Sequence, residues 1–539
     1  MLSMVLLTAK YDTFELIHIH FNTLVFKKHF AYVYAHVRRR VFSEYRCIIC
    51  IPVAEALLKT SVFTIENALL KQIECFNSIK TKPCDCRIGK KFVSLHAKKK
   101  TKVMNTILPF GKPLYVMLKP AGSLCNLACK YCYYLEKQKL YPLDKSKVIS
   151  DELLEEFVRQ YIESQTLPQV LFTWHGGETL MRPISFYKRA LELQRRYARG
   201  RQIDNCLQTN GTLLTDEWCE FLKENNFLVG VSIDGPQEFH DEYRRSRSGA
   251  PSWREVMRGI RLLQKHGVEW NALAVVNDFN VDYPLEFYRF FKEIGCKYIQ
   301  FTPVVERLVK RTDGLTLAPG LQEGGEVTDF SVTAEQWGRF CCAVYDEWVR
   351  HDVGEVFVQL FDATLANWAG EPPGVCSLSG MCGHAAVMEY NGDVYSCDHF
   401  VYPEYRLGNI REQTLTGLMY GDKQKAFARL KHDTLPRQCR ECHFLFACHG
   451  ECPKNRFIRD KYGEPGLNYL CAGYRQFFEH VSDDMDFMKA ELDAQRPPSN
   501  IMQRKKAALR PNKTLIANQS KKGVRIKKYT SLYVNLLKR

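Results

Sequence analysis

The chain has 539 residues, more than one ordinary domain of roughly 100–200 residues. Hydrophobic residues make up 45% and charged residues 25% of it, an average globular composition that excludes wholesale disorder. No run approaches the ~18 apolar residues of a membrane-spanning helix, and the first ten residues lack the basic start and cleavage site of a secretory signal. The sequence therefore predicts a soluble intracellular protein without a membrane partner.

The net charge of +16 is unevenly distributed along the chain. Residues 1–103 carry 18 Lys/Arg against 7 Asp/Glu, and residues 499–539 carry 12 against none, so residues 104–498 carry a net charge of −7. Terminal blocks of one sign are typical of solvated tails. Because the body is mildly acidic, no nucleic-acid partner is expected.

Residues 1–103 show no sustained hydrophobic period. They contain five cysteines, at Cys47, Cys50, Cys75, Cys84 and Cys86, whose spacing offers no complementary pairs for a metal site. The segment is predicted to be an extension of unknown role, either disordered or not native to the functional protein, because Met104 offers an alternative start.

From residue 114 onward, β-rich runs alternate with amphipathic segments. Six strands are predicted, at 114–119, 170–174, 205–209, 228–233, 269–276 and 298–303. Helices are predicted between them, at 151–164, 184–197, 215–224, 252–266 and 283–294, and Ser150, Thr215 and Ser252 are N-cap candidates. This alternation is typical of repeated βαβ units around a parallel sheet, which closes fully or partly into a barrel or stays open.

The βα pattern ends beyond residue 357. Residues 304–332 are predicted to form a loop and residues 333–349 a helix, after which a cysteine-rich segment begins. The sequence therefore predicts an α/β domain at 104–332, a cysteine-rich domain at 333–496 and a basic tail at 497–539.

The 21 cysteines are the strongest compositional signal. In a chain without an export signal they are expected to be reduced, and clusters at short spacings point to metal or iron–sulfur ligation. Cys125, Cys129 and Cys132 directly follow the first predicted strand. On spacing alone, they fit equally a zinc site with a distant fourth ligand and an iron–sulfur cluster with one open iron. Their place at the carboxyl end of a βα strand, where active sites are built, favours the open cluster.

The Cys125-x3-Cys129-x2-Cys132 spacing after the first of six strands resembles the signature of the radical S-adenosylmethionine (SAM) enzymes. The segment Trp174-His-Gly-Gly-Glu-Thr179 resembles that family's Gly-Gly-Glu segment, with His175 and Thr179 in place of the usual Gln and Pro. The resemblance implies a partial (β/α)6 barrel and a 4Fe-4S cluster that chelates SAM and cleaves it to a 5′-deoxyadenosyl radical. It places five residues at SAM-contacting positions: Tyr131, Gly177, Ser232, Arg244 and Val305. An Arg fork also suits a carboxylate on general grounds.

Eight more cysteines lie downstream, spaced Cys376-x5-Cys382-x14-Cys397 and Cys439-x2-Cys442-x5-Cys448-x3-Cys452-x18-Cys471. On spacing alone, zinc ribbons account for such pairs at least as well as iron–sulfur clusters do. The second run, however, resembles the SPASM extension of radical SAM enzymes, which holds auxiliary 4Fe-4S clusters. That resemblance implies two clusters, one bound by Cys376, Cys382, Cys397 and Cys452 and the other by Cys439, Cys442, Cys448 and Cys471.

Over residues 110–495 the chain is most similar, among SPASM enzymes, to the anaerobic sulfatase-maturating enzymes. The segments Gln208-Thr-Asn-Gly-Thr212, Val231-Ser-Ile-Asp-Gly235 and Val394-Tyr-Ser-Cys397-Asp398 carry this resemblance. Members of this family oxidise one Cys or Ser of a sulfatase to Cα-formylglycine without oxygen. The resemblance implies an unfolded sulfatase as substrate, three 4Fe-4S clusters and SAM as cofactors, a flavodoxin or ferredoxin as electron donor, and a cytoplasmic location.

Asp398, next to Cys397, occupies the position of this family's proton acceptor, and a nearby auxiliary cluster would be a natural acceptor for the departing electron. On the residues alone, an Asp beside a Cys is better explained as a cap of the ligand loop. Two other functions remain open at this point. One is a different SPASM peptide modifier that forms a thioether or carbon–carbon crosslink, and the other is a non-enzymatic zinc-ribbon nucleic-acid-binding protein.

Overall fold

The computed structural model describes residues 2–10, 13–21, 114–141, 147–313, 315–318, 320–383 and 385–508. The chain divides into two units, residues 1–106 and 107–539, which are described separately. The first unit contains an antiparallel hairpin of β1 (Leu2–Lys10) and β2 (Thr13–Phe21), which the sequence analysis did not predict. The five cysteines between Cys47 and Cys86 lie outside the described residues.

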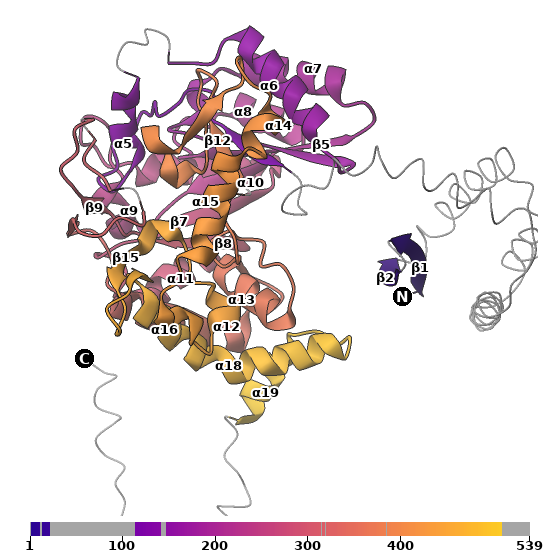
Figure 1. Ribbon diagram of the computed structural model, residues 1–539, viewed down its shortest axis with the longest axis vertical. Coiled ribbons are helices and arrows are strands. Elements are labelled where there is room, and N and C mark those ends of the chain that lie inside the picture. The colour runs from indigo at the N-terminus through magenta and orange to yellow at the C-terminus, as the bar shows by residue number, and fades with distance from the viewer. Residues whose placement is uncertain are drawn as a thin grey trace, which may run out of the picture. The chain divides into compact units, whose positions relative to one another are not determined.

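The second unit is built on one ten-stranded sheet in the order β11-β8-β7-β6-β5-β4-β3-β12-β13-β14 (Figure 1). Its central strands are β3 (Tyr115–Leu118), β4 (Gln169–Trp174), β5 (Gln202–Thr209), β6 (Leu228–Ser232), β7 (Trp270–Val276) and β8 (Tyr298–Pro303). Each of these pairs in parallel with the next along the chain. The predicted six-stranded βα array is therefore confirmed. It is a partial barrel, because β12 joins β3 on one side and β11 joins β8 on the other.

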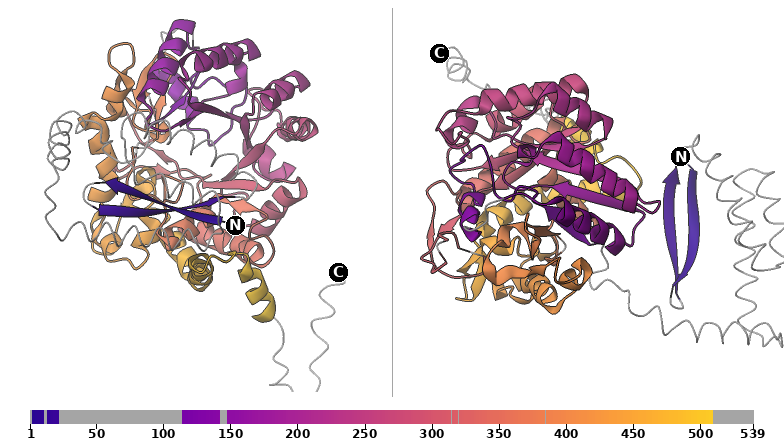
Figure 2. Two further views of the ribbon diagram at one scale, coloured as in Figure 1. Left: turned by 90° about the vertical axis from the view of Figure 1, so that its right-hand side faces the viewer. Right: turned by 90° about the horizontal axis from the view of Figure 1, so that it is seen from above.

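Helices cover the outside of this sheet, as the purple and magenta ribbons show (Figure 2). They are α6 (Asp151–Ser164), α7 (Ile184–Tyr197), α8 (Asp216–Glu224), α9 (Gln237–Tyr243), α10 (Trp253–His266) and α11 (Pro284–Glu293). Ser150 and Thr215 cap α6 and α8 as predicted. Ser252 stands at the N-cap of α10, but its hydroxyl donates to the Arg244 carbonyl oxygen at 2.6 Å instead of capping the helix.

The cysteine-rich region continues the same sheet. It adds β11 (Phe357–Val358), β12 (Ala385–Met388), β13 (Asp393–Tyr395) and β14 (Arg406–Asn409), while β9 (Arg307–Leu308) and β10 (Glu326–Val327) pair within the segment predicted as a loop. β12 runs parallel to β3 with Met388 opposite Leu118. The cysteine-rich region also contains α12 (Ala334–His351), α13 (Gln359–Ala369), α14 (Leu415–Met419), α15 (Asp422–Asp433), α16 (Arg437–Arg440), α17 (Leu445–Cys448), β15 (Arg456–Arg459), β16 (Pro465–Asn468) and α18 (Cys471–Asp493). The sheet therefore continues across the predicted domain boundary.

Helices α12 and α18 pack closely, and glycine makes this possible. A Cβ at Gly473 would lie 2.0 Å from the Ala334 carbonyl oxygen. The first residues of the predicted basic tail form α19 (Asn500–Ala508), which packs on α12 and buries Ile501 completely. Among the described helices, none is long and apolar enough to cross a membrane.

Candidate functional site

Cys125, Cys129 and Cys132 lie in the loop between β3 and α5 (Tyr134–Lys137). The main chain of this loop is fixed from across the barrel, since Ala128 N donates to Arg245 O at 2.8 Å and Lys130 N donates to Tyr243 O at 3.0 Å. Burial, together with the neighbouring thiols of the trio, raises the pKa of the Cys129 thiol to about 12 and that of Cys132 to about 11. Thiolates are the ligating form of cysteine, so a cationic metal core is what would stabilise this trio in its ionised form.

Residues Gly176, Gly177 and Glu178 hold this loop against the end of β4. Gly177 N donates to Gly122 O at 2.9 Å and Glu178 N donates to Leu124 O at 2.7 Å. A Cβ at Gly177 would lie 2.1 Å from Leu124 O, so only glycine permits this approach. The buried Glu178 carboxylate accepts hydrogen bonds from Leu180 N, Thr209 Oγ1 and Asn210 N at 2.7–2.9 Å. Glu178 therefore serves as a scaffold for the cysteine loop.

Tyr131 and Arg244 meet at a residue that the sequence analysis did not single out. Both donate to Asp234 Oδ2, Tyr131 through its hydroxyl and Arg244 through Nε at 2.8 Å. Asp234 is fully buried, and its Oδ1 accepts from Val275 N at 2.9 Å. Arg244 thus binds Asp234 through Nε. The Asp within the segment Val231-Ser-Ile-Asp-Gly235 was the feature of the sequence that could have identified this residue.

The other two predicted SAM contacts lie at the same edge of the sheet. Ser232 ends β6 and its Oγ accepts from Gln208 Nε2 at 2.9 Å. Val305 follows β8 with its side chain buried, and its carbonyl oxygen accepts from Lys454 Nζ at 2.6 Å. Among the described residues, neither makes a polar contact with Arg244 or Tyr131.

Replacing Asp234 with Asn is expected to lower the free energy of unfolding by about 3–5 kcal/mol, because it leaves the buried Arg244 guanidinium unpaired. Chemical denaturation of the apo-protein measures this. Asp493→Asn is the matched control, since it breaks an exposed pair with Lys489 and should cost about 0–1 kcal/mol. Equal losses in the two variants would show that the Asp234–Arg244 pair has no special role in stability.

The eight downstream cysteines fall into two groups by their influence on one another's ionisation. Burial raises the pKa of Cys397 well above its usual range, and Cys376, Cys452 and Cys382 add to this increase. The second group is linked in the same way, because Cys471 and Cys442 raise the pKa of Cys439, and Cys471 raises that of Cys448. Cys452 therefore joins the upstream group although it lies in the downstream run. In the described part of the chain, no three His, Cys, Asp or Glu residues are arranged to hold a single metal ion.

Asp398 begins the 3-10 turn η3 (Asp398–Phe400), directly after Cys397. Its Oδ2 accepts from Tyr133 OH at 2.6 Å and also from Tyr134 OH, and its Oδ1 lies 2.7 Å from Lys119 Nζ. Lys119 is fully buried at the end of β3 and also contacts Glu389 Oε1 at 3.0 Å. Burial alone would raise the pKa of the Asp398 carboxyl, but the Lys119 ammonium, together with His175 and Tyr133, holds it well below its usual range. The group is an ionised carboxylate.

Asp398 connects the two cysteine regions. Tyr133 and Tyr134 directly follow Cys132, and Tyr134 OH lies 3.1 Å from Nδ1 of His175, the residue before Gly176. Within the described residues, Asp398 Oδ1 has no aligned hydrogen-bond donor apart from its ion pair with Lys119. This buried oxygen therefore keeps an acceptor position beyond its ion pair with Lys119.

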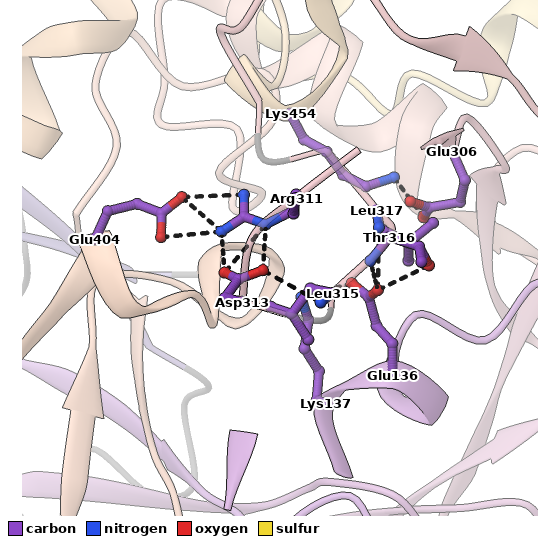
Figure 3. A network of polar contacts seen from close by, with 10 residues as sticks. All are labelled: Glu136, Lys137, Glu306, Arg311, Asp313, Leu315, Thr316, Leu317, Glu404 and Lys454. Atoms are coloured by element: carbon purple, nitrogen blue, oxygen red, sulfur yellow. Dashed lines mark hydrogen bonds and ion pairs between the residues drawn. The ribbon is translucent and has the colours of Figure 1, made fainter. Parts of the chain in front are cut away.

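A cavity of about 430 Å³ adjoins the cysteine loop. Its lining includes Lys130, Cys132, Glu136, Leu308, Thr328 and Phe330. The segment 311–317 beside this cavity is held by polar contacts on two sides (Figure 3). Glu136 accepts from Thr316 N at 2.7 Å, and Arg311 pairs with Glu404 at 3.2 Å. These contacts join the barrel side of the cavity to the cysteine-rich region.

Comparisons with known proteins agree with this geometry. Residues 120–291 match the radical SAM superfamily, and residues 379–443 match SPASM, an iron-sulfur cluster-binding domain. The chain is 67% identical to the serine-type anaerobic sulfatase-maturating enzyme of Bacteroides thetaiotaomicron, over 74% of this chain and 96% of that protein. It is 32% identical to the cysteine-type enzyme of Clostridium perfringens (strain 13 / Type A), over 68% and 96% of the two chains. A solved structure of native anSMEcpe with bound AdoMet and Cp18Cys peptide is 30% identical, with a TM-score of 0.62 over 71% of this chain and all of that one.

Proposed function

Because this chain belongs to the anaerobic sulfatase-maturating enzymes of the radical SAM superfamily, we propose that it is a serine-type member, which oxidises a Ser of an unfolded sulfatase to Cα-formylglycine. The 67% identity to a serine-type enzyme, against 32% to a cysteine-type enzyme, supports the choice of serine. The observation that carries the mechanism is the position of Asp398, hydrogen-bonded to the two tyrosines that follow Cys132.

The enzyme's cofactors are SAM, the radical SAM 4Fe-4S cluster and the additional clusters of the SPASM domain. We propose that Cys125, Cys129 and Cys132 hold the first cluster and that the two downstream groups of four cysteines hold one auxiliary cluster each. Tyr131, Gly177, Ser232, Arg244 and Val305 are the proposed SAM contacts. When bound, SAM supplies the 5′-deoxyadenosyl radical that removes a hydrogen atom from the substrate Cβ.

The chain's own residues handle the proton of this reaction. Oxidation of a Ser side chain to an aldehyde removes one hydrogen atom from Cβ, one proton from Oγ and one electron. Asp398 Oδ1 accepts the Oγ proton as general base, while Lys119 and Tyr133 hold the carboxylate in place. Tyr134 OH also lies 3.1 Å from His175 Nδ1, which accepts from Gly176 N at 2.8 Å, so His175 helps to position Tyr134 beside Asp398.

We also propose an electron donor and a cellular compartment for the enzyme. A flavodoxin or ferredoxin is the proposed reductant, as the family resemblance implies. The cytoplasm is the proposed compartment, since the 21 cysteines, eleven of them in the three proposed ligand groups, call for reducing conditions.

The test uses two sulfatase-derived peptides that differ only in Ser or Cys at the target position. The anaerobically reconstituted enzyme receives SAM, a strong reductant and one peptide, and mass spectrometry follows the products. We expect the Ser peptide to lose two hydrogen atoms and gain an aldehyde that reacts with a hydrazide. Turnover of the Cys peptide alone would contradict the serine assignment. An internal crosslink without an aldehyde would instead favour a different SPASM chemistry.

A further inference from the structure

Arg456, the first residue of β15, is a buried cation with an unusual set of partners. Its side chain is fully buried. Nε donates to Gly466 O at 2.8 Å, and Nη1 and Nη2 donate to the carbonyl oxygens of Lys431 (at 2.6 Å) and Thr434. In the described part of the chain, no ion pair joins Arg456 to a carboxylate, and all three nitrogens are directed at main-chain oxygens. An unpaired charge in a protein interior is costly, and an anion close to Arg456 would offset that cost.

The ionisable groups that act most strongly on Arg456 are cysteines. Burial lowers the pKa of its guanidinium, and the strongest opposing influences are Cys439, Cys382, Cys448 and Cys452. Two of these thiols belong to each of the two downstream groups. The backbone agrees, because a Cβ at Gly450, which lies between Cys448 and Cys452, would be 3.7 Å from Arg456 Nη1. Cys448 and Cys452 belong to different groups, so Arg456 lies beside the segment that joins the two proposed auxiliary cluster sites. Among the described residues, its hydrogen bonds go to main-chain oxygens and none to a sulfur.

We propose that Arg456 is a shared counter-cation for both auxiliary clusters, which raises the reduction potential of each. The inference rests on the cluster-binding assignment made above. Adding an electron makes a cluster more negative, and a fixed positive charge close by favours that state, most strongly where the dielectric constant is low. Because the guanidinium donates to carbonyl oxygens, its influence on the clusters is electrostatic and needs no hydrogen bond to sulfur.

Lys431 provides a natural contrast. It is also fully buried, and its Nζ donates to the carbonyl oxygens of Cys376 at 2.9 Å and Ser377 at 2.5 Å. It lowers the pKa of Cys376 and Cys382, which belong to one group only. The buried Glu451 opposes it there by raising both pKa values. Lys431 is thus expected to act on one cluster, whereas Arg456 acts on two.

The experiment is a potentiometric titration of the reconstituted holoenzyme, followed by electron paramagnetic resonance. The radical SAM cluster is identified by the response of its signal to added SAM, which leaves two auxiliary signals. In Arg456→Met, both auxiliary midpoint potentials should become more negative. In Lys431→Met, only one should shift. Arg456→Lys keeps the charge but loses most of the hydrogen bonds, so its two potentials should stay close to those of the parent.

Two results would overturn the proposal. One is an Arg456→Met enzyme in which neither or only one auxiliary potential shifts. The other is an Arg456→Lys enzyme in which both auxiliary potentials shift strongly, since this would assign the effect to hydrogen bonding or packing. The Arg456→Lys measurement remains decisive if the Arg456→Met variant does not fold. Neither readout uses a sulfatase peptide, so a failure here is distinct from a failure of the proposed function.

Discussion

Asp398→Asn is expected to lower formylglycine production by about 10²–10⁴-fold, the usual contribution of a general base. The amide oxygen of Asn can still accept hydrogen bonds from Tyr133 and Tyr134, but it cannot take a proton from the substrate. The cluster ligands are unchanged, so iron content and reductive cleavage of SAM should persist. Measuring 5′-deoxyadenosine and aldehyde peptide in the same reaction gives the ratio that reports this uncoupling.

Asp393→Asn is the matched control for this prediction. Asp393 is a buried carboxylate on β13, whose partners are Arg406 at 2.7 Å and Tyr141 at 3.0 Å. Its amide variant should lose stability but keep the parent's ratio of aldehyde to 5′-deoxyadenosine. Full aldehyde formation by Asp398→Asn would remove Asp398 as the base.

The barrel was predictable because its signals are local. The segment that forms α6 has a Ser N-cap followed by apolar residues at helical spacing, and its predicted and observed bounds coincide at Asp151–Ser164. The six central strands were likewise placed within three residues of their observed ends. Patterns of this kind depend only on neighbours within one or two helical turns, so a single sequence contains them.

The buried charges around Asp398 could not be predicted in this way. Lys119 is one charge at the end of an apolar strand, and Glu389 is 270 residues away. They meet because β3 and β12 pair in parallel with Leu118 opposite Met388, which brings the two following residues side by side. That register comes from tertiary packing of segments far apart in the sequence. Arg456 escaped notice for the same reason, since its surroundings are set by two folded groups of cysteines.

Replacing Cys125, Cys129 and Cys132 together with Ala is expected to abolish SAM cleavage. The variant should retain about eight of about twelve iron atoms per chain, because each 4Fe-4S cluster is held by its own set of thiolates. Electron transfer to bound SAM needs an iron with an open position, and the auxiliary sites, with four cysteines each, offer none. Iron analysis and chromatography of 5′-deoxyadenosine measure the two effects separately.

The control for this variant is Cys206→Ala, which removes a half-buried thiol on β5 that contacts Thr173 Oγ1 at 3.0 Å. It should leave both iron content and SAM cleavage unchanged, since packing alone accounts for that residue. The triple variant separates the two roles of cysteine in this chain. Loss of all iron from it would show that the three sites assemble as one unit. Continued formation of 5′-deoxyadenosine would place the radical chemistry away from this loop, the one carboxyl-edge loop among the described residues that carries three cysteines.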